Sequence, residues 1–153
     1  MTNNSKAKAS YIIGKTIQIT LKNMEREVAG RAYRASNELR SAALHVLRGS
    51  RSGRVYRVPG TKKNYKASAP GEAPANRTGV FRMSWGPHIR VEKQGKKYRC
   101  VSGIESNVKV GKYLLGDLLE NGTGRMEPRP YKDAVKERAM PKIKQIYDAP
   151  YNV

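Results

Sequence analysis

Residues 67–85, ASAPGEAPANRTGVFRMSW, most constrain how this chain folds. Pro70 and Pro74 hold the backbone φ angle at about −65° and offer no N–H group to a helix or a sheet. The residues before them are driven towards extended conformations, and Gly71 and Gly79 favour turns. The segment is therefore predicted to be an ordered, extended loop. Packed structure is expected to resume at the apolar residues that follow it, which are Val80, Phe81, Met83 and Trp85.

The first 48 residues predict a flexible end, a short strand and a long helix. Residues 1–10 are polar and are expected to be flexible. Residues 16–21, TIQITL, alternate between apolar and polar side chains, which predicts a strand. Asn23 is a suitable N-cap, and apolar residues then recur at steps of three and four, which predicts a helix over residues 23–48. This apolar face consists of Met24, Val28, Ala32, Ala35, Leu39, Ala42 and Val46.

The predicted helix is long for a chain of 153 residues. About 26 residues span about 39 Å, so the helix either lies across its own sheet or overhangs it and packs against a neighbouring subunit. The residues leave both arrangements open. The side opposite the apolar face is expected to carry polar residues, namely Arg26, Arg31, Arg34, Glu38 and Arg40.

The basic middle of the chain predicts a hairpin and one helical turn. Basic and apolar residues alternate within residues 49–66, and the pair Pro59-Gly60 is a turn signal, so this segment is expected to form a hairpin. Residues 78–84 are expected to form a single helical turn capped by Thr78. A hairpin with no core of its own should become ordered on a partner.

The second half of the chain predicts another hairpin and two helices. Residues 86–106 alternate on either side of a Gln94-Gly95 turn, which indicates a second hairpin. Residues 112–121 have apolar side chains at helical spacing. Residues 131–147 predict the last helix, which Pro141 must kink or split. Its inward-facing residues are expected to be Ala134, Val135, Ala139, Ile143 and Ile146.

These elements together predict an α+β fold. A small antiparallel sheet is expected to pack with the long N-terminal helix and the C-terminal helix, with a basic hairpin and loop as an extension. Residues 1–153 form one domain, in which residues 49–78 are the extended hairpin and proline-rich loop. The length allows a modest core.

Two segments resemble a family of head–tail joining proteins of tailed phages, which are also called neck, minor tail or tail-completion proteins. Residues 69–79, APGEAPANRTG, with the apolar and basic run after them, are similar to the family's PGEPPAxDTGxLRxS segment. Residues 113–131, YLLGDLLENGTGRMEPRPY, are similar to its YxxxLExGTxxMxxRPF segment. The departures are Asn76-Arg77, where an acidic residue is usual, and Tyr131, where Phe is usual. The resemblance covers roughly residues 23–147.

The resemblance implies a structural virion protein that forms a homo-oligomeric ring at the head–tail interface, assembled in the host cytoplasm. It implies no cofactor and no reaction. The expected partners are connector or head-closure proteins on one side and tail-terminator or tail-tube proteins on the other, and sixfold symmetry is an analogy with tails of this type. The expected ring contacts are Pro70, Gly71, Glu72, Pro74, Thr78, Gly79, Glu120, Gly122, Thr123, Met126, Arg129 and Pro130.

The positive charge of the chain predicts an anionic partner. Lys and Arg number 31 against 12 Asp and Glu, a formal net charge of +19, and self-repulsion on this scale opposes folding. The charge could line a channel that DNA crosses, or it could meet acidic neighbouring rings. Tyr56 and Tyr65 lie among the basic residues, which suits a phosphate backbone and an acidic protein equally well. The expected contacts are Arg51, Arg54, Arg57, Lys62, Lys63 and Lys66.

A membrane partner and an enzyme are not expected. No apolar run approaches the roughly 20 residues that span a bilayer, and the N-terminus is a poor signal peptide. His45, His88 and Cys100 are too few and too scattered in the sequence for a zinc site, and Cys100 is interpreted as a small buried apolar residue. Three neighbouring acids either bind a divalent ion or, as favoured, form a solvated loop that meets a basic neighbour; these are Asp117, Glu120 and Glu127.

The alternative function is a stand-alone basic protein that binds nucleic acid. The net charge and the interleaved tyrosines favour it. The sequence lacks a helix-turn-helix pattern, an aromatic RNA-binding strand and a zinc finger. A steep salt dependence of DNA binding would distinguish this alternative from a neck subunit.

Overall fold

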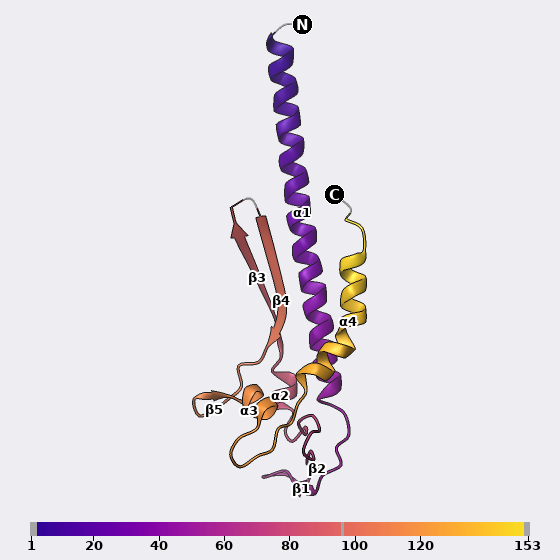
Figure 1. Cartoon of the computed structure of the whole chain (residues 1–153), viewed down its shortest axis with the longest axis vertical. Coiled ribbons are helices and arrows are strands. Elements are labelled where there is room, and N and C mark those ends of the chain that lie inside the picture. The colour runs from indigo at the N-terminus through magenta and orange to yellow at the C-terminus, as the bar shows by residue number, and fades with distance from the viewer. Residues whose placement is uncertain (1–2, 96, 152–153) are drawn as a thin grey trace.

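The computed structural model describes residues 3–95 and 97–151 and has the predicted α+β fold (Figure 1). A long N-terminal helix stands beside a C-terminal helix and a long hairpin, and two shorter hairpins lie at one end of the molecule. The predicted small sheet is divided into three separate two-stranded antiparallel pairs. The helices are α1 (Asn3–Val46), α2 (Val80–Met83), α3 (Leu115–Asn121) and α4 (Lys132–Asp148). The strands are β1 (Val55–Arg57), β2 (Asn64–Lys66), β3 (Gly86–Gln94), β4 (Lys97–Glu105), β5 (Lys109–Val110) and β6 (Tyr113–Leu114).

Helix α1 replaces three of the expected N-terminal elements. It has 44 residues, so it is about 66 Å long. The strand predicted over residues 16–21 is wrong, and so is the helix start at Asn23, because both lie inside α1. The expected flexible end is helical from Asn3, and the first two residues lie outside the described part of the chain. The physical reason is that a formed helix extends by one hydrogen bond per added residue, at no further nucleation cost.

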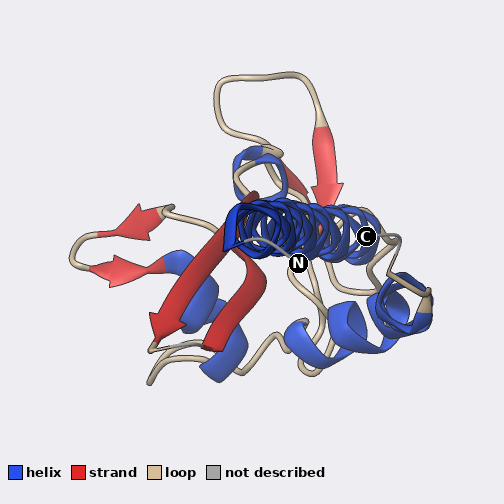
Figure 2. Ribbon diagram, turned by 90° about the horizontal axis from the view of Figure 1, so that it is seen from above, coloured by secondary structure: helices blue, strands red, loops and turns tan. Residues whose placement is uncertain are grey.

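The C-terminal half of α1 is the part that packs. Ala32, Ala35 and Ala42 of the predicted face are buried, and Met24 of the same face is exposed. This half contacts α4 and both strands of the β3–β4 hairpin, which lie on different sides of the helix in Figure 2. The helix therefore overhangs the elements that it packs against, and the packing of its free part against a neighbouring subunit stays a prediction.

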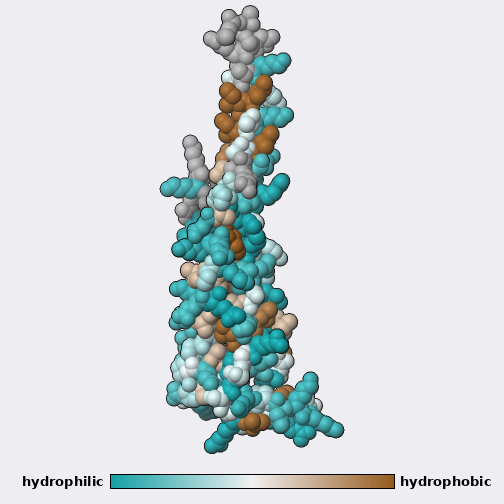
Figure 3. Space-filling view, turned by 90° about the vertical axis from the view of Figure 1, so that its right-hand side faces the viewer, coloured by the Kyte–Doolittle hydropathy of each residue, from teal (hydrophilic) through white to brown (hydrophobic). Residues whose placement is uncertain are grey.

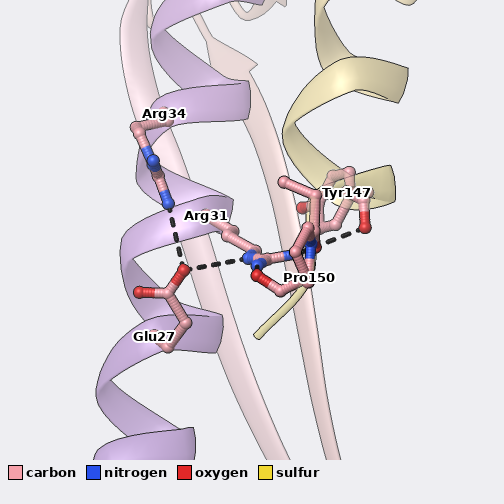
Figure 4. A network of polar contacts seen from close by, with 6 residues as sticks. Glu27, Arg31, Arg34, Tyr147 and Pro150 are labelled. Atoms are coloured by element: carbon pink, nitrogen blue, oxygen red, sulfur yellow. Dashed lines mark hydrogen bonds and ion pairs between the residues drawn. The ribbon is translucent and has the colours of Figure 1, made fainter. Parts of the chain in front are cut away.

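Arg31 is the clearest error in the predicted polar side of the helix. Its side chain is only 2% exposed. The guanidinium donates hydrogen bonds to the backbone carbonyls of Tyr147, Ala149 and Pro150, at 3.2, 2.5 and 2.6 Å, and it pairs with Glu27 at 3.0 Å (Figure 4). The arginine is buried because it binds the free carbonyls where α4 ends.

Two of the three hairpins follow the turn signals of the sequence. In the long hairpin, Gly86 pairs with Glu105 and Gln94 with Lys97. In the basic hairpin, Tyr56 pairs with Tyr65, and the turn glycine Gly60 has a φ of 73°. These predictions are confirmed. The third pair, β5–β6, occupies the start of the segment predicted as helix 112–121, so α3 is shorter than predicted.

The core lies where α1, α4 and α2 meet. It consists of Ala42, Ala43, Leu47, Tyr131, Val135 and Ala139, with Phe81 and Trp85 packed against it. The rings of Phe81, Trp85 and Tyr131 meet edge-to-face with centroids 5.5 to 5.8 Å apart, a favourable geometry for aromatic pairs. Trp85 thus anchors the core as predicted.

Four local predictions are corrected in whole or in part. The N-cap of α2 is Gly79, in a left-handed conformation, and not Thr78. Helix α4 is continuous through Pro141 and so is not split there, whereas a kink at this residue stays a prediction. Ala134 is exposed where an inward position was expected. Cys100 is half-buried rather than buried.

Candidate docking surface

The two proline-framed loops predicted as ring contacts meet in the fold. The N–H of Gly71 donates to the carbonyl of Pro128 at 3.2 Å. The second loop is closed by Arg129, whose N–H donates to Leu119 O at 2.7 Å, and by a pair of bonds between Thr123 and Met126. Segments more than 50 residues apart therefore form one continuous surface, which lies at the end of the molecule away from the N-terminus (Figure 1).

Glu72 stabilises the first loop from within. Its carboxylate accepts hydrogen bonds from the backbone N–H groups of Ala69, at 2.8 Å, and Ser52, at 3.1 Å. The Ser52 hydroxyl, these N–H groups and the nearby positive charge of Arg51 lower the pKa of Glu72 to about 2. The predicted contact residue therefore works inside the chain and holds the loop in shape.

Glu120 has a similar internal role in the second loop. Its carboxylate accepts hydrogen bonds from the N–H groups of Tyr131, at 2.9 Å, and Lys132, at 3.2 Å. These are free donors at the start of α4, which a carboxylate suits. Asp117 pairs with the Lys132 ammonium at 3.2 Å. In the described residues no group of three or more His, Cys, Asp or Glu could hold a metal ion.

A groove of about 670 Å³ runs beside the first loop. Its walls come from the loop, from α2 and α3, and from strands β2 and β5. Its apolar lining includes Pro74, Phe81, Leu115, Leu119 and Met126. Pro74 is buried, so this predicted contact forms part of the wall and is not free at the surface.

Two arginines beside the groove carry buried donors. Within the described part of the chain, Arg82 Nε and Arg129 Nη1 are buried without a hydrogen-bond partner, and both residues line the groove. A buried donor without an acceptor costs about 1–3 kcal/mol. Both donors are out of reach of solvent, so they lower the stability of the free chain and do not face into the groove.

The predicted contact residues divide into two sets. Pro70, Gly71, Thr78, Thr123 and Pro130 are exposed and can meet a neighbour directly. The remaining ones are half-buried or buried and form the support beneath them, namely Glu72, Pro74, Gly79, Glu120, Gly122, Met126 and Arg129.

The basic hairpin presents most of the residues predicted to meet an anion. Its exposed basic side chains are Arg54, Arg57, Lys62, Lys63 and Lys66. The rings of Tyr56 and Tyr65 pack together with centroids 6.0 Å apart. Arg57 also donates to Thr61 O at 2.8 Å, which braces the turn. The hairpin is therefore a charged projection held by its strand pairing and by hydrogen bonds within its turn.

Arg51 does not belong to this exposed set. Its guanidinium donates to the carbonyl of Pro74, at 3.0 and 3.2 Å, and to that of Val46, at 2.9 Å. Burial lowers the pKa of Arg51, and the charge of Glu72 opposes that shift. The residue holds the end of α1 against the proline-rich loop, so its prediction as an anion contact is corrected.

The comparisons with known proteins give no relative for this geometry. No family model, no curated protein and no solved structure matches the chain. Among the described residues, no helix is both long enough and apolar enough to cross a membrane.

One exposed surface was not predicted from the sequence, the N-terminal half of α1. Every described side chain in residues 8–26 is exposed. The signal was present in the sequence, because Ile13, Ile17 and Leu21 extend the three- and four-residue steps of the helical face upstream of Asn23. The alternation of residues 16–21 competed with that pattern and favoured a strand.

Proposed function

We propose that this chain is a structural subunit of a homo-oligomeric ring at the head–tail interface of a tailed phage. The resemblance of residues 69–79 and 113–131 to the head–tail joining family supports the phage assignment. The two segments meet through the hydrogen bond between Gly71 and Pro128, so the residues that carry the resemblance lie on one surface. Its ring neighbours would contact this surface, with connector and tail proteins above and below.

The observation that carries the proposed assembly is the large exposed surface of the chain. The chain exposes 11519 Å². A compact monomer of 17.1 kDa exposes about 7,700 Å². The buried core is correspondingly small and rich in alanine. A chain with so much surface and so little core gains stability mainly when neighbours cover it.

The position of the charge fits a ring through which DNA passes or which meets acidic rings. The exposed basic hairpin is at the same end of the molecule as the two loops (Figure 1). Neighbouring copies would therefore place their hairpins side by side, which concentrates positive charge. Sixfold symmetry remains an analogy with tails of this type.

The test is a phage that encodes the chain, with the gene deleted or altered. We expect deletion to leave full heads and free tails that do not join, as seen by electron microscopy. The double variant Thr78→Glu/Thr123→Glu alters two exposed loop residues and should reproduce the defect. The control Lys136→Glu/Lys144→Glu lies on the exposed side of α4 and should join normally. Normal joining and infectivity without the gene would exclude the proposal.

A stand-alone nucleic-acid-binding protein is the second candidate, and the exposed basic hairpin is the observation that favours it. Such a protein should bind DNA with a log affinity that falls steeply with log salt. Lys62→Glu/Lys63→Glu should then weaken binding and flatten the salt slope. The control Lys136→Glu/Lys144→Glu has the same change in charge and should have a smaller effect. An isolated neck subunit should bind poorly in every form.

A further inference from the structure

Large apolar side chains are exposed along the part of α1 that projects beyond the other elements (Figures 1 and 3). They are between 41% and 60% exposed, which leaves a contiguous apolar surface of a kind that marks an interaction site. The residues are Ile12, Ile13, Ile17, Ile19, Leu21 and Met24.

These side chains share one broad face of the helix. At about 100° per residue, they and the two threonines Thr16 and Thr20 fall within a sector of about 200°. The hydroxyl of Thr16 donates to Ile12 O at 3.0 Å, so covering it would leave no unpaired donor. The exposed lysines Lys8 and Lys15 lie outside the sector, seven residues apart, and Lys22 continues their line.

The sector continues the line along which α4 lies on α1. Residues 18 apart are separated by about five turns and lie in line along a helix. Ile13 is therefore in line with Arg31, and Thr20 with Glu38. Arg31 binds the carbonyls at the end of α4, and Glu38 pairs with Lys142 of α4 at 3.3 Å. The sector therefore lies on the same face of α1 as the α4 contact, beyond the end of α4.

We propose that this sector packs against the same segment of α1 from neighbouring copies, in a bundle of at least three helices. A helix that packs on one partner needs an apolar stripe of about 100°. The sector is about twice as wide, so it can be covered by two neighbours. A closed ring of three or more identical subunits supplies two neighbours to every copy.

The charges of the segment fit a bundle. No charged side chain among the described positions 8 and 10–24 lies within the sector, so the lysines would lie beside the packed faces and not between them. The inference rests on the proposed homo-oligomer and adds the segment that joins its members. It does not depend on the phage assignment, because the purified chain tests it.

Sedimentation equilibrium of the full chain provides the first measurement. The wild type should form trimers or larger assemblies as its concentration rises. Ile13→Gln/Ile17→Gln should weaken the association by about 100-fold or more, since two buried isoleucines are lost from each copy. The matched control Lys15→Gln/Lys22→Gln replaces two exposed residues outside the sector and should associate at least as tightly as the wild type. A chain that stays monomeric or stops at a dimer at millimolar concentration would overturn the proposal.

Disulfide trapping provides the second measurement, in a Cys100→Ser background. Thr20→Cys lies near the middle of the sector and should link copies rapidly under mild oxidation, whereas Lys15→Cys should not. Equal linking at both positions would contradict a specific bundle. Tight binding to anionic phospholipid vesicles by a chain that stays monomeric would assign the sector to a membrane instead. If association fails while head–tail joining still requires the gene, only the bundle is excluded.

Discussion

Replacing Arg31 tests whether one buried guanidinium holds the two long helices together. The side chain joins α1 to the C-terminal segment through three carbonyls and stacks on the ring of Tyr151 with a distance of 3.8 Å from Cζ to the centroid. Arg31→Met keeps most of the volume and removes every donor. Hydrogen bonds to a charged group contribute about 1.5–3 kcal/mol each.

The expected loss is smaller than the sum of these bonds, because the carbonyls belong to exposed residues and water can replace the guanidinium. We therefore expect Arg31→Met to lower the free energy of unfolding by about 3 kcal/mol, within the range for breaking a buried charged contact. Arg31→Lys should lose less, because it keeps the charge and gives up the planar fork. The free energy of unfolding of a small domain is about 5–15 kcal/mol in total, so either loss is measurable.

Urea unfolding followed by circular dichroism gives the free energy, and hydrogen exchange of residues 143–151 reports the local effect. The matched control is Arg34→Met. Arg34 makes one contact with Glu27, at 3.3 Å, and its side chain is 57% exposed, so its removal should cost less than about 0.5 kcal/mol. Equal costs for the two variants, or unchanged exchange at the end of α4 in Arg31→Met, would refute the reasoning.

Three further variants test the loops. Gly122 has a φ of 76°, and a Cβ there would lie 2.7 Å from a backbone oxygen. Gly122→Ala should therefore lower the free energy of unfolding by about 2 kcal/mol. The control Gly124→Ala, at a position with open space around it, should leave the free energy of unfolding unchanged. The pKa of Glu72 is lowered in the folded state, so its contribution to the free energy of unfolding is complete above pH 4.5 and is lost as pH falls through about 2. Carbon NMR of the carboxylate should show a titration midpoint at about that pH. In Glu72→Gln the pH-dependent shift of the two bonded amides should be absent. Tyr131→Phe removes a hydroxyl that donates to Gly116 O and should cost about 1 kcal/mol in urea unfolding.

The hairpins could be predicted from the sequence because their signals are local. Pro59-Gly60 and Gln94-Gly95 specify turns within two residues, and both glycines have positive φ angles in the structure. The flanking alternation then fixes which residues pair. The same reasoning failed for residues 16–21, where a short alternating stretch occurs inside a longer helical pattern. Residues 16–21 are helical, and not a strand with a two-residue period, because the helix continues beyond residue 23.

The burial of Arg31 could not be predicted, because its partners are backbone carbonyls more than 110 residues away. Backbone groups have no sequence signature, so a buried arginine looks like any solvent-facing one. The internal roles of Glu72, Glu120 and Arg51 were missed for the same reason. The resemblance named both loops as ring contacts without predicting that they meet, and it did not separate the residues that face outward from those that support them.

The two interaction surfaces should respond to salt in opposite ways, because different forces act at the two ends of the molecule. At the end of α1 the proposed contact is apolar, and the lysines beside it repel their counterparts on other copies. Added salt screens that repulsion, so self-association should strengthen or stay constant. At the basic hairpin any contact with DNA releases counterions and weakens as salt rises. Sedimentation and DNA binding measured across one salt series therefore separate the two surfaces within a single protein. Parallel weakening of both would mean that charge, and not the apolar sector, holds the copies together.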